Sequence, residues 1–206
     1  GFYLSGHLFD ESGAEVRRFA RRRIADLVDS REPQLLAGIV GEMRVVNGQR
    51  GRSAIFLLDD GSEAIETVVN EDLLDANREL LVDDALLIAQ GKVQIDRFNG
   101  GLRFNVNQLW DLPAARTRFG RYLVVAVNGG LPPVGDVVRI WPVKRTETDQ
   151  GELTQGLPVR LQIERTGATA ELDLGDDGRF WPSDEALARW RQLARGGYAV
   201  IVYDGE

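Results

Sequence analysis

Hydrophobic and polar residues alternate over most of the first half of the chain, which is the pattern of strands with one buried face. Short clusters of Gly, Asn and Asp separate the alternating stretches and predict turns. The alternation predicts five strands, at residues 35–46, 53–58, 64–69, 85–95 and 102–109. Between the third and fourth of these, leucines recur at helical spacing over residues 71–81 and predict a helix.

The order of these elements favours one kind of all-β domain. Three strands, one helix and two strands is the element order of an OB-fold, a five-stranded Greek-key β-barrel. Gly38 and Gly41 suit the bent first strand that such a barrel requires. We therefore predict an OB-fold domain over residues 35–112. An N-terminal helical linker segment at 1–34, with an amphipathic helix at 14–29, is expected to precede it.

The pattern changes after the predicted barrel. The expected elements are a short helix at 114–121, a strand at 122–127, a hairpin of strands at 158–165 and 169–174, a helix capped by Ser183 and a strand at 198–203. Residues 144–156 are polar and are expected to form a mobile stretch. Strands and helices mixed in this way predict a separate, small α+β C-terminal domain over residues 113–206.

Composition excludes several kinds of chemistry. The chain has no cysteine and a single histidine, His7, which excludes disulfides, thiol catalysis and multi-histidine metal sites. Asp59 and Asp60 form a carboxylate pair, but no base, nucleophile or third ligand stands at useful spacing. We therefore expect them to close a hairpin turn, with no catalytic residue, metal or cofactor in the chain. No apolar run is long enough to cross a bilayer. The absence of cysteine fits a cytoplasmic protein, which is expected.

Charge is unevenly distributed along the chain. Residues 35–112 carry seven basic and thirteen acidic side chains, a net charge of −6. Residues 1–34 are neutral, and residues 113–206 carry a net charge of −1. Because nucleic acid is itself negative, an acidic barrel argues against a strongly basic binding surface. Any binding of single-stranded DNA is therefore expected to be weak.

The candidates for such weak binding lie on the loops and the outward face of the predicted barrel. Phe98, between the fourth and fifth strands, is the best candidate for stacking on a base. On the fifth strand, alternation places Phe104 in the core and Arg103 and Asn105 on the other face. The full set of nucleic-acid candidates is Arg44, Arg50, Arg52, Arg97, Phe98, Arg103 and Asn105.

Aromatic residues crowd near the end of the chain. Phe180, Trp181, Trp190 and Tyr203 fall within 24 residues. A small core needs some of these side chains, and Trp and Tyr are also the residues that dominate protein interfaces. These four are the candidate anchors for a protein partner.

Several short stretches resemble one protein family in the same order. The resemblance rests on Gly1–His7, Leu36–Val40, Arg50–Gly51, Leu57–Gly61, Asp75–Arg78, Gly91–Val93, Phe98–Arg103, Leu157–Leu161 and Trp181–Asp184. Together they resemble the C-terminal, non-catalytic region of bacterial replicative DNA polymerase III alpha subunits. No single stretch is specific, but the ordered set covers nearly the whole chain.

The resemblance implies a role in replication. It implies that the barrel lies near or binds single-stranded template DNA and that the final domain docks the tau subunit of the clamp loader. The sliding clamp would be bound by segments outside this chain. The parent protein would be a DNA-directed DNA polymerase, a nucleotidyltransferase whose catalytic carboxylates lie upstream, so the chain itself is expected to be non-catalytic.

Two alternatives remain open at the level of sequence. One is a free-standing OB-fold protein that binds single-stranded DNA or RNA. The other is a purely structural protein-interaction module with no nucleic-acid role. The acidic barrel favours the second of these over the first.

Overall fold

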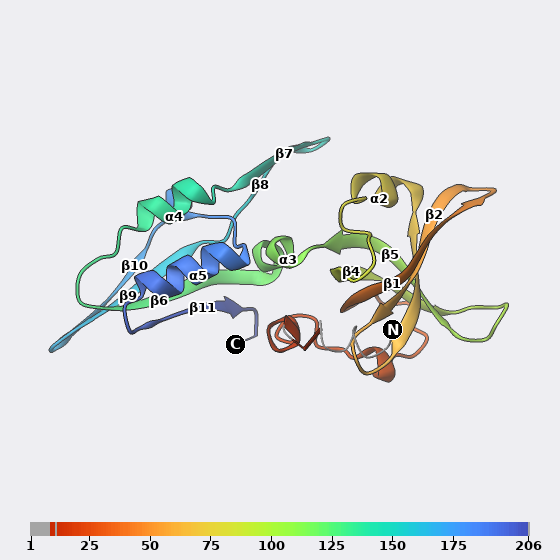
Figure 1. Cartoon of the computed structure of the whole chain (residues 1–206), viewed down its shortest axis with the longest axis horizontal. Coiled ribbons are helices and arrows are strands. Elements are labelled where there is room, and N and C mark those ends of the chain that lie inside the picture. Colours follow the sequence, from red (N-terminus) through yellow and green to blue (C-terminus); the bar gives the residue numbers. More distant parts are fainter. Residues whose placement is uncertain (1–8, 11, 206) are drawn as a thin grey trace. The chain divides into compact units, whose positions relative to one another are not determined.

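The computed structural model describes residues 9–10 and 12–205 of the 206-residue chain. Within the chain two compact units are distinguished, Gly1–Leu112 and Pro113–Glu206. Figure 1 shows their elements in sequence colours. Each unit is built around its own sheet, and no helix in the described residues is long and apolar enough to cross a membrane.

The first unit is a closed five-stranded barrel. Its strands are β1 (Gln34–Gly48), β2 (Gly51–Asp59), β3 (Ala64–Asn70), β4 (Leu86–Ile95) and β5 (Leu102–Trp110). They follow the order β1-β2-β3-β5-β4, and β1 closes the barrel by pairing with β4. All neighbours are antiparallel except β3 and β5. This is the OB-fold topology, so the predicted fold is confirmed.

Glycines allow the barrel to close tightly. A Cβ atom at Gly38 would lie 2.7 Å from the carbonyl oxygen of Asp59 on the neighbouring strand. A Cβ atom at Gly91 would collide with the carbonyl oxygen of Asn105, where the register between β4 and β5 shifts. The bend predicted in the first strand is a bulge between Gly41 and Arg44, and it places Glu42 at a φ of 54°. Only residues without a side chain fit such close backbone approaches.

The helix between the third and fourth strands is shorter than its leucine spacing predicts. It is α2 (Glu71–Ala76), and it lies at one end of the barrel (Figure 1). The Asn70 side chain caps its start by accepting from the backbone N–H of Leu73. Asn77 ends it, because its side chain donates to the carbonyl of Leu73 and its backbone leaves the helical region.

The predicted N-terminal helix over 14–29 is wrong in extent. The chain is helical at 9–10 and 12–16, turns at 17–19, and has only one further short 3-10 helix, η1 (Ile24–Asp26), in this region. Several of its apolar positions are nevertheless buried, since Val16, Ile24 and Leu27 have almost no exposed surface, whereas Val28 is exposed. Further along, the backbone N–H of Ile24 donates to the Asp60 side chain and not to a carbonyl one turn earlier, so this part of the chain is held outside a continuous helix.

The second unit is a four-stranded sheet with helices. Its strands are β6 (Gly120–Asn128), β9 (Val159–Arg165), β10 (Ala168–Asp173) and β11 (Tyr198–Tyr203), in the order β10-β9-β6-β11. Its helices are α3 (Leu112–Phe119), α4 (Val134–Ile140), η2 (Asp176–Gly178) and α5 (Asp184–Leu193). The Ser183 side chain caps α5 by accepting from the backbone N–H of Ala186, as predicted. The predicted α+β class is confirmed.

The stretch predicted to be polar and mobile forms a separate hairpin. Its strands are β7 (Lys144–Thr148) and β8 (Gly151–Gln155), which extend away from the four-stranded sheet (Figure 1). Almost all residues of the two strands are exposed and many are polar, so the stretch looks like a loop in the sequence. The five backbone pairings between the strands are nevertheless regular. The sequence-based prediction failed here because neither face of the hairpin is buried.

Candidate nucleic-acid interface

Strand alternation exposes one continuous outer face on the barrel. Backbone register aligns Arg44, Ile55, Val68 and Asn105 in one row across β1, β2, β3 and β5. A second row runs through Leu57, Glu66 and Arg103. These seven residues are called the outer face below. Ile55, Leu57 and Val68 are half-buried, whereas Phe56, Thr67 and Phe104 between them point into the core.

The cations of the outer face are held by carboxylates. Glu66 pairs with Arg103 through one oxygen and lies 3.5 Å from Arg44 through the other. Asp96 lies 2.9 Å from Arg103 and is itself nearly inaccessible to solvent. The acidic charge predicted to weaken this surface therefore sits at its centre. Asn105 lies beside Gln94, whose side-chain oxygen is 3.4 Å from the Asn105 amide nitrogen.

Arg52, another predicted contact, forms ion pairs with side chains of the helix α2. Its guanidinium donates to Glu71 at 2.8 Å and lies 3.1 Å from Asp75. The hydrogen bond from Arg52 lowers the pKa of Glu71, so the pair stays charged over the neutral range. Arg50 differs, because it lies at the exposed tip of the β1–β2 hairpin and has no ion pair with a described residue.

The loop between β4 and β5 presents Phe98 to solvent. This ring is 97% exposed, which is exceptional for a large apolar side chain. Its backbone N–H donates to Asp96, and a further bond from Asp96 N–H to the Gly101 carbonyl closes the loop. The ring is therefore exposed on a loop with a fixed backbone. An aromatic ring exposed in this way makes little contribution to the stability of the fold and is available to stack on a base.

Arg31 is a functional candidate that sequence reasoning missed. It lines a hollow of about 400 Å³ together with Asp29, Ser30, Gln94, Ile95 and Arg97. A backbone hydrogen bond from Ser30 to the Val93 carbonyl brings this segment to β4. Arg31 and Arg97 are more than 60 residues apart in the sequence, so local patterns could not predict that they lie near each other. Both guanidiniums are exposed, and neither forms an ion pair within the described part of the chain.

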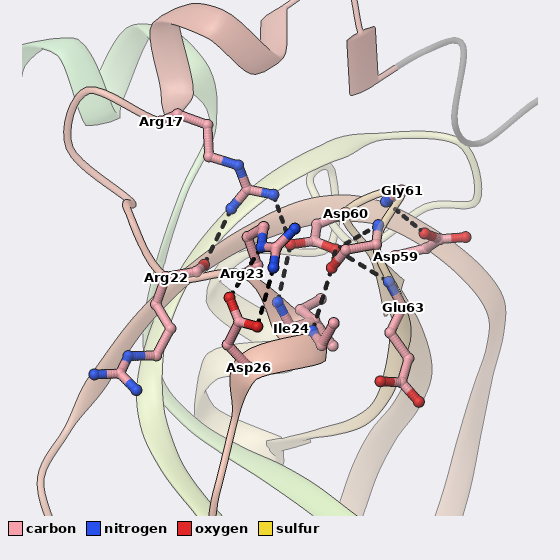
Figure 2. Close-up of polar contacts among 11 residues, drawn as sticks. Arg17, Arg22, Arg23, Ile24, Asp26, Asp59, Asp60, Gly61 and Glu63 are labelled. Atoms are coloured by element: carbon pink, nitrogen blue, oxygen red, sulfur yellow. Dashed lines mark hydrogen bonds and ion pairs between the residues drawn. The ribbon is translucent and has the colours of Figure 1, made fainter.

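The carboxylate pair at the end of β2 has a structural role, as predicted. Asp59 accepts the backbone N–H of Gly61, and Asp60 accepts those of Ser62 and Ile24 (Figure 2). Arg17 donates to Asp60 at 2.6 Å. Burial alone would raise the pKa of Asp60, but these hydrogen bonds outweigh burial and hold its pKa below the usual range.

The described residues show no arrangement of side chains that would hold a metal ion. No group of three or more His, Cys, Asp or Glu side chains in them is arranged to bind a metal ion. His7, the lone histidine, falls outside the described residues. The hydrogen bonds to Asp60 fix the N-terminal segment to the β2–β3 turn. This structural role accounts for the arrangement of the side chains around Asp60.

Three of the four aromatic anchors predicted for a partner are core residues. Phe180, Trp190 and Tyr203 have no exposed surface, and the rings of Phe180 and Trp190 meet edge to face at 5.6 Å. Their burial counts against a role as partner anchors, because a small sheet-and-helix unit fills its core with a few large rings. Trp181 is half-buried, and the Lys144 amine lies 3.9 Å from its ring centre.

Comparison with solved structures finds small β-barrel domains. The second OB-fold domain of replication protein A from Methanococcus maripaludis matches with a TM-score of 0.36 and 16% identity, covering 44% of this chain and 93% of that one. The SSB domain of a Synechococcus sp. protein matches with a TM-score of 0.35 and 11% identity, covering 40% and 98%. No protein-family model matches the chain.

Comparison with curated sequences finds one kind of protein over nearly the whole chain. The DNA polymerase III alpha subunit of Pseudomonas aeruginosa is 34% identical over 192 residues, which is 93% of this chain and 16% of that protein. The alpha subunit of Escherichia coli K12 is 30% identical over 209 residues, 99% of this chain and 18% of that protein. The chain spans less than a fifth of the length of these relatives. Over nearly its whole length, the chain is therefore similar to one segment of the bacterial DNA polymerase III alpha subunits.

Proposed function

We propose that the chain is the C-terminal, non-catalytic region of a replicative DNA polymerase alpha subunit. In this proposal the first unit binds single-stranded template DNA weakly. The second unit docks the tau subunit of the clamp loader, and polymerisation and clamp binding reside in other segments of the parent protein. The similarity to alpha subunits over 93–99% of the chain supports the assignment to replication.

The exposed ring of Phe98 carries the proposal for DNA. Base stacking on an aromatic ring is tolerant of sequence and contributes about 1–3 kcal/mol per base. Four exposed cations have no ion pair within the described residues. Arg31 and Arg97 line one hollow, Lys92 lies on β4, and Arg50 lies at the tip of the β1–β2 hairpin. These groups would contact phosphates while Phe98 stacks on a base.

The outer face itself contributes little charge. Arg44, Arg52 and Arg103 were predicted contacts, but each is paired with a carboxylate. A strand crossing this face would therefore meet half-buried apolar side chains and a nearly neutral ion-pair network. Binding is expected to be sequence-blind and in the micromolar range or weaker at physiological salt, and to matter mainly when the polymerase holds the template nearby.

The stacking role of Phe98 is testable by substitution. We expect Phe98→Ala to weaken binding of a fluorescently labelled oligothymidine about tenfold, because one stacked base is lost. The ring is almost fully exposed, so its removal leaves the fold unchanged. Fluorescence anisotropy with the 206-residue chain measures this affinity.

Val82→Ala is the matched control for Phe98→Ala. Val82 is also exposed and apolar, but it follows α2 rather than lying in the β4–β5 loop. Its substitution should leave the affinity within a factor of two. An unchanged affinity in Phe98→Ala would show that bases do not stack on this ring.

Tau docking is proposed for the second unit. The resemblance at Leu157–Leu161 and Trp181–Asp184 supports it, since both stretches belong to this unit. Of the four aromatic candidates, Trp181 alone offers exposed surface to a partner. Calorimetric titration with tau tests the assignment, and undiminished affinity after deletion of residues 113–206 would refute it.

A further inference from the structure

We propose that Glu66 acts as an electrostatic brake on the binding of single-stranded DNA. This inference rests on the proposed function of the first unit. By holding Arg44 and Arg103, Glu66 keeps two cations at the centre of the barrel face from reaching phosphates. The residue would thus set how tightly the template is held.

The position of Glu66 is central on the outer face. It lies on β3, with Leu57 of β2 on one side in the backbone register and Arg103 of β5 on the other. A strand that runs between the two hairpin tips, from Arg50 to Phe98, would cross this region. The carboxylate would then repel the passing phosphates, and its ion pairs would occupy the neighbouring guanidiniums.

The two arginines are held unequally. Arg44 is 57% exposed along its side chain and lies 3.5 Å from Glu66, its one ion-pair partner among the described residues. Arg103 is more buried and is also held at 2.9 Å by Asp96, which is nearly inaccessible. Neutralising Glu66 would therefore release Arg44, while Asp96 would keep Arg103 in place.

Glu66 is not expected to be essential for folding. Its side chain and that of Arg44 are both partly exposed, and ion pairs of this kind contribute little to stability. Glutamine keeps the size of the side chain and can still accept a hydrogen bond from Arg103. Glu66→Gln therefore changes charge with little change in packing.

The experiment compares Glu66→Gln with Glu63→Gln. Glu63 lies in the exposed β2–β3 turn, outside the outer face, and its substitution makes the same change in net charge. Affinity of the 206-residue chain for labelled oligothymidine is measured by anisotropy across a salt series. We expect Glu66→Gln to bind about tenfold more tightly, and Glu63→Gln to stay within a factor of two of the unsubstituted chain.

The salt series identifies the released cation. One additional phosphate contact steepens the slope of log affinity against log salt by about 0.7. Adding Arg44→Ala to Glu66→Gln should remove most of both the gain in affinity and the steeper slope. If Arg44 makes no contribution, the double variant will bind like Glu66→Gln, which would contradict the release of Arg44.

The outcomes separate this inference from the proposed function. If the unsubstituted chain binds and Glu66→Gln binds no more tightly, the brake is refuted and the DNA-binding proposal stands. An equal gain in Glu63→Gln would reduce the effect to net charge and also refute the brake. If neither the chain nor Glu66→Gln binds oligothymidine, both proposals fail. Circular dichroism of each variant verifies that it is folded.

Discussion

Replacing Asp60 by asparagine is expected to lower the free energy of unfolding of the barrel unit by about 3 kcal/mol, the cost typical of breaking a buried charged pair. The Asp60 side chain has no exposed surface, and its two oxygens accept from Arg17, Ser62 and the backbone N–H of Ile24. An asparagine replaces one acceptor oxygen by an NH₂ group, which would face these donors and leave some of them unpaired. Urea unfolding, followed by amide hydrogen exchange in β2 and β3, measures the change in this unit alone.

Asp59→Asn is the matched control for Asp60→Asn. The Asp59 side chain accepts one hydrogen bond, from the exposed N–H of Gly61, and asparagine makes the same bond in turns. We expect a change below about 0.5 kcal/mol, as for ordinary surface substitutions. Equal destabilisation by both substitutions would show that the buried network around Asp60 has no special role.

The Asp60 effect should depend on pH in one direction. Its pKa is lowered in the folded state, so the charged carboxylate stabilises the fold above the unfolded pKa of about 3.9. That contribution is lost as the pH falls through the lower folded pKa. The difference in stability between the unsubstituted chain and Asp60→Asn should therefore be constant near neutrality and shrink below about pH 4.

Substitution of Trp190 by alanine is expected to destabilise the second unit by about 3–5 kcal/mol, the range typical of a large buried aromatic. Trp190 has no exposed surface and packs edge to face on Phe180. Its indole nitrogen is buried without a hydrogen-bond partner, so the loss comes from packing alone. Thermal unfolding followed by far-UV circular dichroism gives the change without relying on tryptophan fluorescence.

Trp181→Ala separates folding from partner binding. This ring is only half-buried, so its removal should cost much less stability than removal of Trp190. If tau docks here, Trp181→Ala should weaken tau binding about 30-fold while the unit stays folded, which corresponds to about 2 kcal/mol at an interface anchor. Loss of tau binding in Trp190→Ala would report unfolding and not a lost contact.

The strands β2, β3 and β5 of the barrel could be predicted because each has one buried face. In β5, for example, Phe104 and Val106 are buried and Asn105 and Asn107 are exposed, so the alternation is visible in the sequence. The β7–β8 hairpin has no buried face and was predicted as a mobile stretch. Alternation predicts a strand only where the two sides of that strand meet different environments.

The candidate site was harder to predict because its charges are paired through space. Arg44 and Arg103 look like free cations in the sequence, and their partner Glu66 is 22 and 37 residues away from them. The N-terminal helix was overpredicted for the same reason, since the bond from Ile24 N–H to Asp60 spans 36 residues. The position of Phe98 between two predicted strands was enough to identify it as a stacking candidate, because the exposure of a loop residue does not depend on contacts with distant parts of the chain.

Binding of labelled oligothymidine by the 206-residue chain across a salt series tests the central claim most directly. Three or four phosphate contacts, drawn from Arg31, Arg50, Lys92 and Arg97, predict a slope of log affinity against log salt of roughly −2 to −3. The predicted affinity is micromolar or weaker at physiological salt, and it should not depend on base sequence. Nanomolar affinity, a slope near zero, or no binding at any salt concentration would contradict the account.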